Sequence, residues 1–215
     1  MIKNIIVVTI ILLFAFSILF VSVLRTASVK YSFYGESPNY QDEQISGRSD
    51  QLASMEIDYY LPYEGPVTPD HPLWPLKAAR DRVWLFVTTN PYRKSELNLL
   101  FADKRIVASQ KLFDQGDFEK GYTTLTKAEK YLENACNIEQ EIRSEGGDTT
   151  ELAERLINAS LKHRLVIEQI LLIAPSDAKG KIMNTEKYSI EVYNDKRGVL
   201  ESAGLPVPEN PFNRE

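Results

Sequence analysis

The distribution of apolar residues divides the chain into an apolar run, a polar stretch, a proline-rich segment and a long helical region. The run, IIVVTIILLFAFSILFVSVL, occupies residues 5–24 and contains no charge. As a helix it would be about 30 Å long, which matches the hydrocarbon core of a bilayer. Cleaved signal peptides have shorter apolar stretches and a small-x-small site, and Arg25 interrupts the place for such a site. We therefore predict an uncleaved transmembrane signal anchor over residues 1–25.

The orientation of this anchor is only weakly indicated by its flanking charges. Lys3 precedes the run, whereas Arg25 and Lys30 follow it, so the charges nearly balance. A head of three or four residues inserts most simply when it stays inside, which leaves the C-terminal part outside the cytoplasm. We expect a single-pass protein of the cell membrane. Residues 26–58 are polar and show no period, so they are predicted to form a flexible linker.

Five prolines mark the next segment, YYLPYEGPVTPDHPLWPLK, residues 59–77, and the last four are three residues apart. That spacing matches the three residues per turn of polyproline II. The segment could be a ligand for the groove of a partner. Alternatively, it is a stiff strap whose aromatic side chains pack on the helices that follow. We favour the strap, because Tyr60, Leu61, Tyr63 and Trp74 would otherwise be exposed to water.

Apolar residues at three- and four-residue spacing predict a first helix between about residues 73 and 89. Pro72 and Pro75 fit its first turn, where a missing N–H costs little. A second helix follows, with Asn90 as its N-cap, and ends before Gly116. The stripe of the first helix consists of Leu73, Leu76, Ala79, Val83, Phe86 and Val87.

The second helix is apolar on two faces, which predicts neighbours on two sides. A third helix is predicted over residues 118–145 with Asp117 as its cap. A fourth runs to residue 174 after a D-x-x-E capping box that begins at Asp148, and a weaker fifth lies between residues 177 and 203. The two faces of the second helix are Leu97, Leu100, Phe101, Ala108 and Leu112, and Leu99, Ala102, Ile106 and Phe113.

These patterns predict an all-α fold, because no useful segment alternates with a period of two. Short turns between long amphipathic helices favour an antiparallel bundle of four to five helices. The expected organisation is therefore the anchor, the linker, a helical domain over residues 59–203 that starts with the proline-rich strap, and a frayed tail over residues 204–215.

Composition narrows the functional classes. The chain of 215 residues has 25 basic and 30 acidic residues and a net charge of −5. We expect no nucleic-acid partner, because binding phosphates requires a basic patch. The single cysteine, Cys136, excludes an intramolecular disulfide. With only two histidines beside it, little remains for a zinc site.

Three stretches, LPYEGPVTPDHPLWPLKAARDR, VTTNPYRKSELNLLFADKR and TLTKAEKYLENA, carry a resemblance over residues 59–135. They resemble a bacterial family of membrane-anchored proteins that share a domain of unknown function. The chain departs from that family's pattern at Glu64, where relatives have proline, and at Asn90, where they have aspartate. The resemblance implies an extracytoplasmic helical domain behind one membrane helix, and it implies no catalytic residues.

The chemistry-bearing residues give no catalytic pattern. His163 falls on the apolar stripe of the fourth helix, which favours a hydrogen-bonded core histidine over a metal ligand. His71 is expected to serve at the start of the first helix, and Cys136 to be a buried thiol. The chain has no HExxH, Glu-x-x-His, GxSxG or P-loop motif. We therefore assign no catalytic, cofactor-binding or metal-binding residue and expect no cofactor.

Two functions fit these observations. We favour a membrane-tethered extracytoplasmic module, not an enzyme, that binds or scaffolds an unknown protein or envelope polymer. The alternative is a tethered envelope hydrolase that uses carboxylates, with or without a divalent metal. An enzyme should have a concave cleft with converging acids, whereas a binding module should have a flat or grooved apolar patch.

Overall fold

The computed structural model forms two compact units, residues 1–32 and residues 33–215. It describes residues 7–11, 14, 31–36 and 43–213. Residues 7–11 and 14 are helical, but most of the predicted transmembrane segment lies outside the described residues. Within the described ranges, no helix is both long enough and apolar enough to cross a bilayer.

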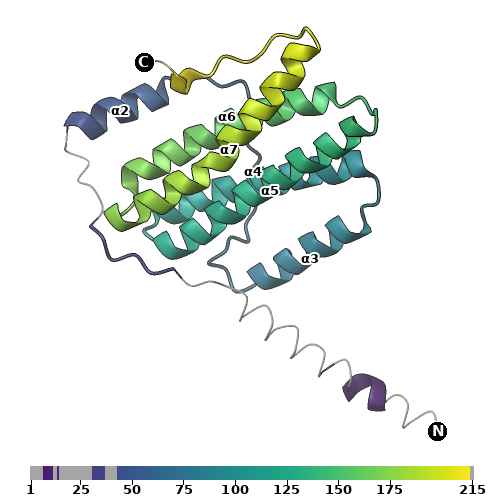
Figure 1. Ribbon diagram of the computed structural model, residues 1–215. Helices are drawn as coiled ribbons and strands as arrows, with labels where there is room; N and C mark the ends of the chain where they lie inside the picture. Colours follow the sequence, from purple (N-terminus) through teal and green to yellow (C-terminus); the bar gives the residue numbers. More distant parts are fainter. Residues whose placement is uncertain (1–6, 12–13, 15–30, 37–42, 214–215) are drawn as a thin grey trace. The chain divides into compact units, whose positions relative to one another are not determined.

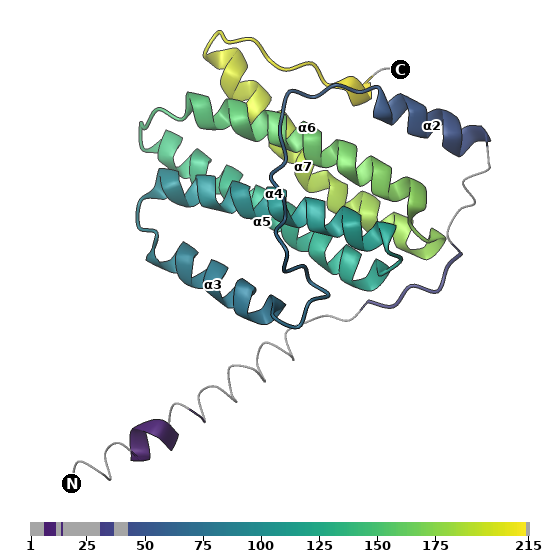
Figure 2. The same ribbon diagram turned by 180° about the vertical axis from the view of Figure 1, so that it is seen from behind.

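An antiparallel four-helix bundle makes up most of the second unit (Figure 1). Helices α4 and α5 form one hairpin, and α6 and α7 form the other. Helix α4 packs against α5 and α6, and α7 packs against α5 and α6 (Figure 2). The described residues contain helices and no strand, which confirms the predicted helical bundle. The bounds are Pro91–Asp114 for α4, Phe118–Ser144 for α5, Thr150–Ile173 for α6 and Ser176–Ser202 for α7.

Local capping explains where these helices begin and end. The Asn90 side chain accepts a hydrogen bond from the backbone of Arg93, and Gly116 adopts a φ of 78° that ends the turn after α4. Asp117 caps α5 as predicted. The prediction that a capping box begins at Asp148 is wrong by one residue, because the N-cap of α6 is Thr149.

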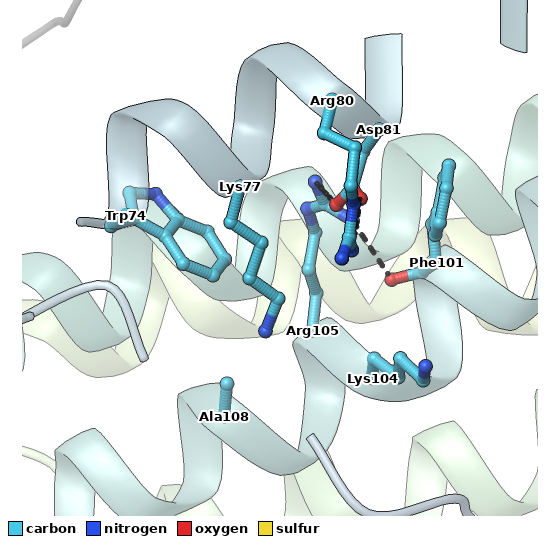
Figure 3. A pocket seen from close by; sticks show the side chains of 8 residues that line it. All are labelled: Trp74, Lys77, Arg80, Asp81, Phe101, Lys104, Arg105 and Ala108. Atoms are coloured by element: carbon cyan, nitrogen blue, oxygen red, sulfur yellow. Dashed lines mark hydrogen bonds and ion pairs between the residues drawn. The ribbon is translucent and has the colours of Figure 1, made fainter. Parts of the chain in front are cut away.

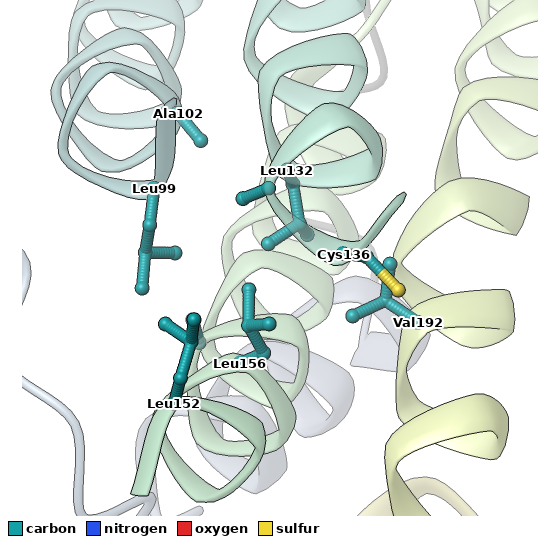
Figure 4. Close-up of a cluster of buried hydrophobic side chains, with 9 residues drawn as sticks. Leu99, Ala102, Leu132, Cys136, Leu152, Leu156 and Val192 are labelled. Atoms are coloured by element: carbon teal, nitrogen blue, oxygen red, sulfur yellow. The ribbon is translucent and has the colours of Figure 1, made fainter. Parts of the chain in front are cut away.

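The core lies between the two hairpins and contains mainly leucine and alanine (Figure 4). The two-faced pattern of α4 is explained by its place between α5 and α6. Helix α7 was expected to be weak, yet it spans 27 residues because buried apolar side chains hold it on α5 and α6. One core cluster consists of Leu99, Ala102, Leu132, Ala135, Cys136, Leu152, Leu156, Ala159 and Val192.

Helix α3, Trp74–Val87, lies at the edge of the bundle (Figures 1 and 2). Among the described helices it contacts only α4. Its apolar stripe points away from the bundle, and Asp81 is its only buried residue. The apolar spacing therefore predicted the helix correctly, but its apolar positions are not the ones that pack on the bundle.

The segment before the strap differs from the predicted flexible linker. Residues Glu43–Ala53 form helix α2, which packs against α6. Leu52 is buried, and Arg48 forms an ion pair of 2.6 Å with Glu168. Still earlier in the chain, the backbone of Tyr34 donates a hydrogen bond of 2.8 Å to Asp177. Polar composition concealed this helix, because α2 needs only one or two apolar contacts to dock.

The segment after α7 also packs on the bundle, in contrast to the expected frayed tail. Val207 and Phe212 pack against a cluster that includes Tyr193 and Leu200. The hydroxyl group of Tyr193 donates a hydrogen bond of 3.0 Å to the carbonyl of Pro208. A short stretch with two apolar residues is thus fixed by contacts that local sequence does not reveal.

The proline-rich strap follows the bundle surface, and of the side chains predicted to pack there Leu61 and Trp74 are half-buried, whereas the two tyrosines are not. Tyr60 and Tyr63 are 83% and 64% exposed, so the prediction that they are buried is wrong. Polar contacts hold the strap instead. Tyr59 donates a hydrogen bond of 2.8 Å to Asp103, and Glu64 forms an ion pair of 3.1 Å with Lys111.

We predict opposite effects for two neighbouring tyrosines of the strap. Tyr60→Ala should change the free energy of unfolding by less than about 0.5 kcal/mol, as for ordinary surface substitutions. Tyr59→Phe should cost about 1–3 kcal/mol, because it leaves an oxygen of Asp103 without its donor. Urea unfolding measures both values. Equal losses for the two variants would contradict the polar attachment of the strap.

Candidate functional site

A buried polar cluster, which we call the His163 network, joins all four helices of the bundle. Nδ1 of His163 on α6 lies 2.7 Å from Oε1 of Glu129 on α5. Nε2 of His163 lies 3.1 Å from Oδ1 of Asp103 on α4. The second oxygen of Asp103 accepts from Tyr59, and that of Glu129 accepts from Ser189 on α7.

This arrangement keeps His163 charged. Burial lowers its pKa, but the hydrogen bonds to Asp103 and Glu129 outweigh burial and raise the pKa to about 9. Because both ring nitrogens face carboxylates, both N–H groups donate, as in an imidazolium ion. His163 is fully buried, so the expectation of a hydrogen-bonded core histidine is confirmed.

A second buried cluster joins α5 to α7. The ammonium group of Lys196 contacts Glu139 and lies 2.7 Å from Asp195. Cys136 lies beside it, with Sγ 3.6 Å from a carboxylate oxygen of Asp195. Burial raises the pKa of the Cys136 thiol to about 11, so the buried thiol expected from the sequence is confirmed and stays protonated at neutral pH.

Neither cluster resembles an open catalytic centre. In both, the charged atoms are paired with one another, and the key side chains of His163, Glu129, Glu139 and Lys196 are fully buried. A substrate would have to displace these pairs from inside the bundle. Within the described part of the chain, no group of three or more His, Cys, Asp or Glu side chains is arranged to hold a metal ion.

The more accessible feature is the contact between α3 and α4, which centres on Arg105 (Figure 3). Its guanidinium group lies 4.4 Å from the ring centroid of Tyr131 and 3.5 Å from an oxygen of the buried Asp81. Nε of Arg105 is buried without a hydrogen-bond partner. Asp81 also pairs with Arg80 at 2.7 Å, so this one carboxylate serves two arginines.

Further cations surround this contact. Lys77 and Lys104 line a cavity of about 10 Å³ together with Arg80 and Arg105 (Figure 3). The ammonium group of Lys77 donates to two strap carbonyls, at 2.7 and 2.8 Å. Burial lowers the pKa of Lys77, and the neighbouring cations lower it further. The cavity has room for about one water molecule. Four cations and one carboxylate, Asp81, line it, so this contact carries net positive charge.

The side of α3 that points away from α4 carries several large apolar side chains that are exposed. Leu76 is 70% exposed, Phe86 87%, and Val83 and Val87 61% each. With Ala79 these residues recur at three- and four-residue spacing and form one stripe. We call this stripe the outward face of α3. Arg80 and Arg82 lie at its two edges, given a rotation of about 100° per residue.

Comparison with known proteins places the chain in a family. Residues 66–177, slightly more than half of the chain, match the domain of unknown function DUF5667. The chain therefore belongs to the DUF5667 family, and the resemblance to a domain-of-unknown-function family is confirmed to that extent. No curated protein and no solved structure matches the chain. The match extends from the strap to the start of α7 and includes all of α3.

Sequence reasoning missed two parts of this site. The carboxylate partners of His163, Asp103 and Glu129, belong to no catalytic motif in the sequence, although each occupies an inward position. A helical wheel would have placed Glu129 next to Ala128 and Leu125 on the buried side of α5. For α3, the signal was present but ambiguous, because an apolar stripe does not reveal what covers it.

We predict that the His163 network makes folding stability depend on pH. The pKa of His163 is raised from about 6.5 in the unfolded chain to about 9, so its contribution is complete below about pH 6.5 and is lost as the pH rises through 9. The full shift corresponds to about 3 kcal/mol. Melting temperature should therefore fall between pH 7 and pH 10.

The chain offers a matched control, since its other histidine, His71, is exposed. His71→Gln should keep the fall in melting temperature with pH. His163→Gln should flatten it and destabilise the fold at neutral pH by about 3–5 kcal/mol, because two buried carboxylates then lack a cation. A wild-type melting temperature that stays constant from pH 7 to pH 10 would contradict a charged His163.

Proposed function

We propose that this protein is a membrane-tethered interaction module whose helical domain lies outside the cytoplasm and binds its partner through the outward face of α3. The exposure of that face carries the proposal. Folded proteins rarely leave a contiguous apolar patch uncovered, and such patches commonly mark interaction sites. Phe86 is the most exposed large apolar side chain of α3, and Val83 lies about one turn away on the same face.

The interior of the bundle supports the same proposal. Asp103 and Glu129 converge on His163 inside the bundle, where a substrate would have to displace buried pairs. Their charges are satisfied by His163, Tyr59 and Ser189. Such saturated networks make a bundle rigid, and a rigid bundle suits a scaffold that presents a helix.

The tether rests on the sequence of residues 5–24, which contain no charge over a length that suits a bilayer. In the proposed topology, α3 and the bundle lie on the outer side of the membrane.

The topology can be tested by thiol labelling, because Cys136 is the chain's single cysteine and is buried. The thiol of Cys136 is also protonated at neutral pH, since its pKa is raised to about 11. In sealed right-side-out vesicles, Lys187→Cys should react with an impermeant maleimide, whereas the wild-type chain should stay unlabelled. Lys3→Cys should react only after permeabilisation. The reverse pattern for Lys187→Cys and Lys3→Cys would contradict the proposed orientation.

The interaction site can be tested by photo-crosslinking of the full chain in its native membrane. A photoreactive residue in place of Phe86 should form adducts with protein, polymer or lipid. The same residue in place of Met183 on α7 is the control, since Met183 is also apolar and 56% exposed. Adducts at position 86 should exceed those at position 183. If neither position forms adducts in a folded chain, the interaction module is wrong.

A further inference from the structure

We propose that the outward face of α3 docks on the surface of a bilayer that contains anionic lipids. This inference rests on the proposed function and names the partner of the same surface. It would make α3 an interfacial helix, which lies in the plane of the membrane with its apolar side among the acyl chains and its cations at the headgroups. Three properties of α3 support this choice of partner.

The first property is the order of side chains around the helix. An apolar stripe roughly 100° wide separates Arg80 from Arg82, so the two arginines lie at its opposite edges. Arginine at such edges can lay its aliphatic part along the apolar surface while its guanidinium group stays in the headgroup layer. A helix with leucine, valine and phenylalanine between two arginines therefore matches the depth profile of a lipid interface.

The second property is charge. The chain as a whole has a net charge of −5, yet α3 has three cations and one carboxylate. That carboxylate, Asp81, is buried against Arg105, and Lys104 lies beside the same contact. The α3 edge is therefore positive on an acidic protein, and anionic headgroups are its complement.

The third property is size, which argues against a second copy of the chain. Helix α3 has 14 residues and is about 21 Å long. One face of so short a helix buries far less than the roughly 800 Å² per partner that stable protein interfaces need. Two copies would also bring the cations of the two α3 helices close together, and Asp81, the one carboxylate of each α3, is already shared by Arg80 and Arg105. A bilayer has neither limitation.

Tethering makes a weak interaction sufficient. In the proposed topology the domain cannot diffuse away from the bilayer, so the docking of α3 is an intramolecular step with a high effective concentration. A small contact, made by a few apolar side chains and two or three cations, can then hold the domain on the membrane for part of the time. The docking is thus expected to be reversible and sensitive to salt.

The test adds a tryptophan to the outward face by the substitution Val83→Trp, which every variant below also carries, because the chain's own Trp74 and Trp84 contact Arg105 and Phe101 of α4. The full chain is reconstituted into vesicles of phosphatidylcholine alone, or of phosphatidylcholine mixed with phosphatidylglycerol. Brominated phosphatidylcholine in both leaflets quenches tryptophan that reaches the acyl region, whichever way the chain inserts. Quenching should be about twofold greater or more in the mixture, and should fall at about 1 M salt, where the Debye length is ~3 Å.

Two matched pairs of variants make the result specific. Arg82→Glu and Phe86→Glu should each reduce the quenching in the mixture by about twofold or more. Lys187→Glu and Met183→Glu make the same changes on exposed positions of α7 and should leave it unchanged. Circular dichroism and melting of each variant establish that it folds. Because Arg82 and Phe86 are exposed, their substitution should preserve folding.

Several outcomes would overturn the lipid proposal. It fails if quenching is absent, if it is equal in the two lipid mixtures, or if all four variants behave alike. It also fails if the face is covered by a second copy, which light scattering in detergent would detect as a dimer lost in Phe86→Glu. Adducts between position 86 and a protein, without quenching by brominated lipid, would overturn lipid docking and leave the interaction module standing. If there are neither adducts at position 86 nor quenching by brominated lipid, both the interaction module and lipid docking are wrong.

Discussion

The fold depends on one buried cation, the imidazolium group of His163. It bridges Glu129 on α5 and Asp103 on α4 from its own place on α6, and the outer oxygens of these carboxylates bind α7 and the strap. An apolar core would tolerate small rotations and slips of the helices, whereas this network is satisfied in one arrangement only. Burying charge is costly, so the network contributes less to net stability than to the choice of a single packing. The same holds for Lys196 and Glu139, which join α7 to α5.

Polar and apolar groups thus exchange their usual places in two parts of this molecule. The bundle keeps paired charges in its interior, while α3 presents valine, leucine and phenylalanine to its surroundings. Both choices have a cost when the domain is considered alone, since buried ions lose hydration and exposed apolar groups order water. The first is offset by hydrogen bonds within the bundle. The second is offset only when a partner covers α3, and the proposed functions of this helix follow from that imbalance.

The helices of the bundle were predicted well because their caps depend on residues that are adjacent in the sequence. Asn90 and Asp117 cap helices through their own side chains, and Gly116 ends one through its backbone conformation. The failures concern residues whose position depends on distant segments. Tyr60 and Tyr63 are aromatic, yet they remain 83% and 64% exposed. Helix α2 is polar, but α6 provides a place for Leu52. Spacing shows that a face exists, and only the tertiary fold shows what lies against it.

Because few contacts attach α3, the free energy of opening this helix is separate from that of unfolding the bundle. It contacts only α4 among the described helices, through Arg105, Asp81 and the ring of Trp74, and no large apolar side chain of its stripe enters the core. Detaching it would break a few polar contacts and the edge contact of Trp84 with Phe101, whereas separating α4 from α5 would open the whole core. Helix α3 can therefore open as a separate cooperative unit while the bundle stays native. Such local opening would let the helix change its tilt against whatever covers it, without any cost in the folding of α4–α7.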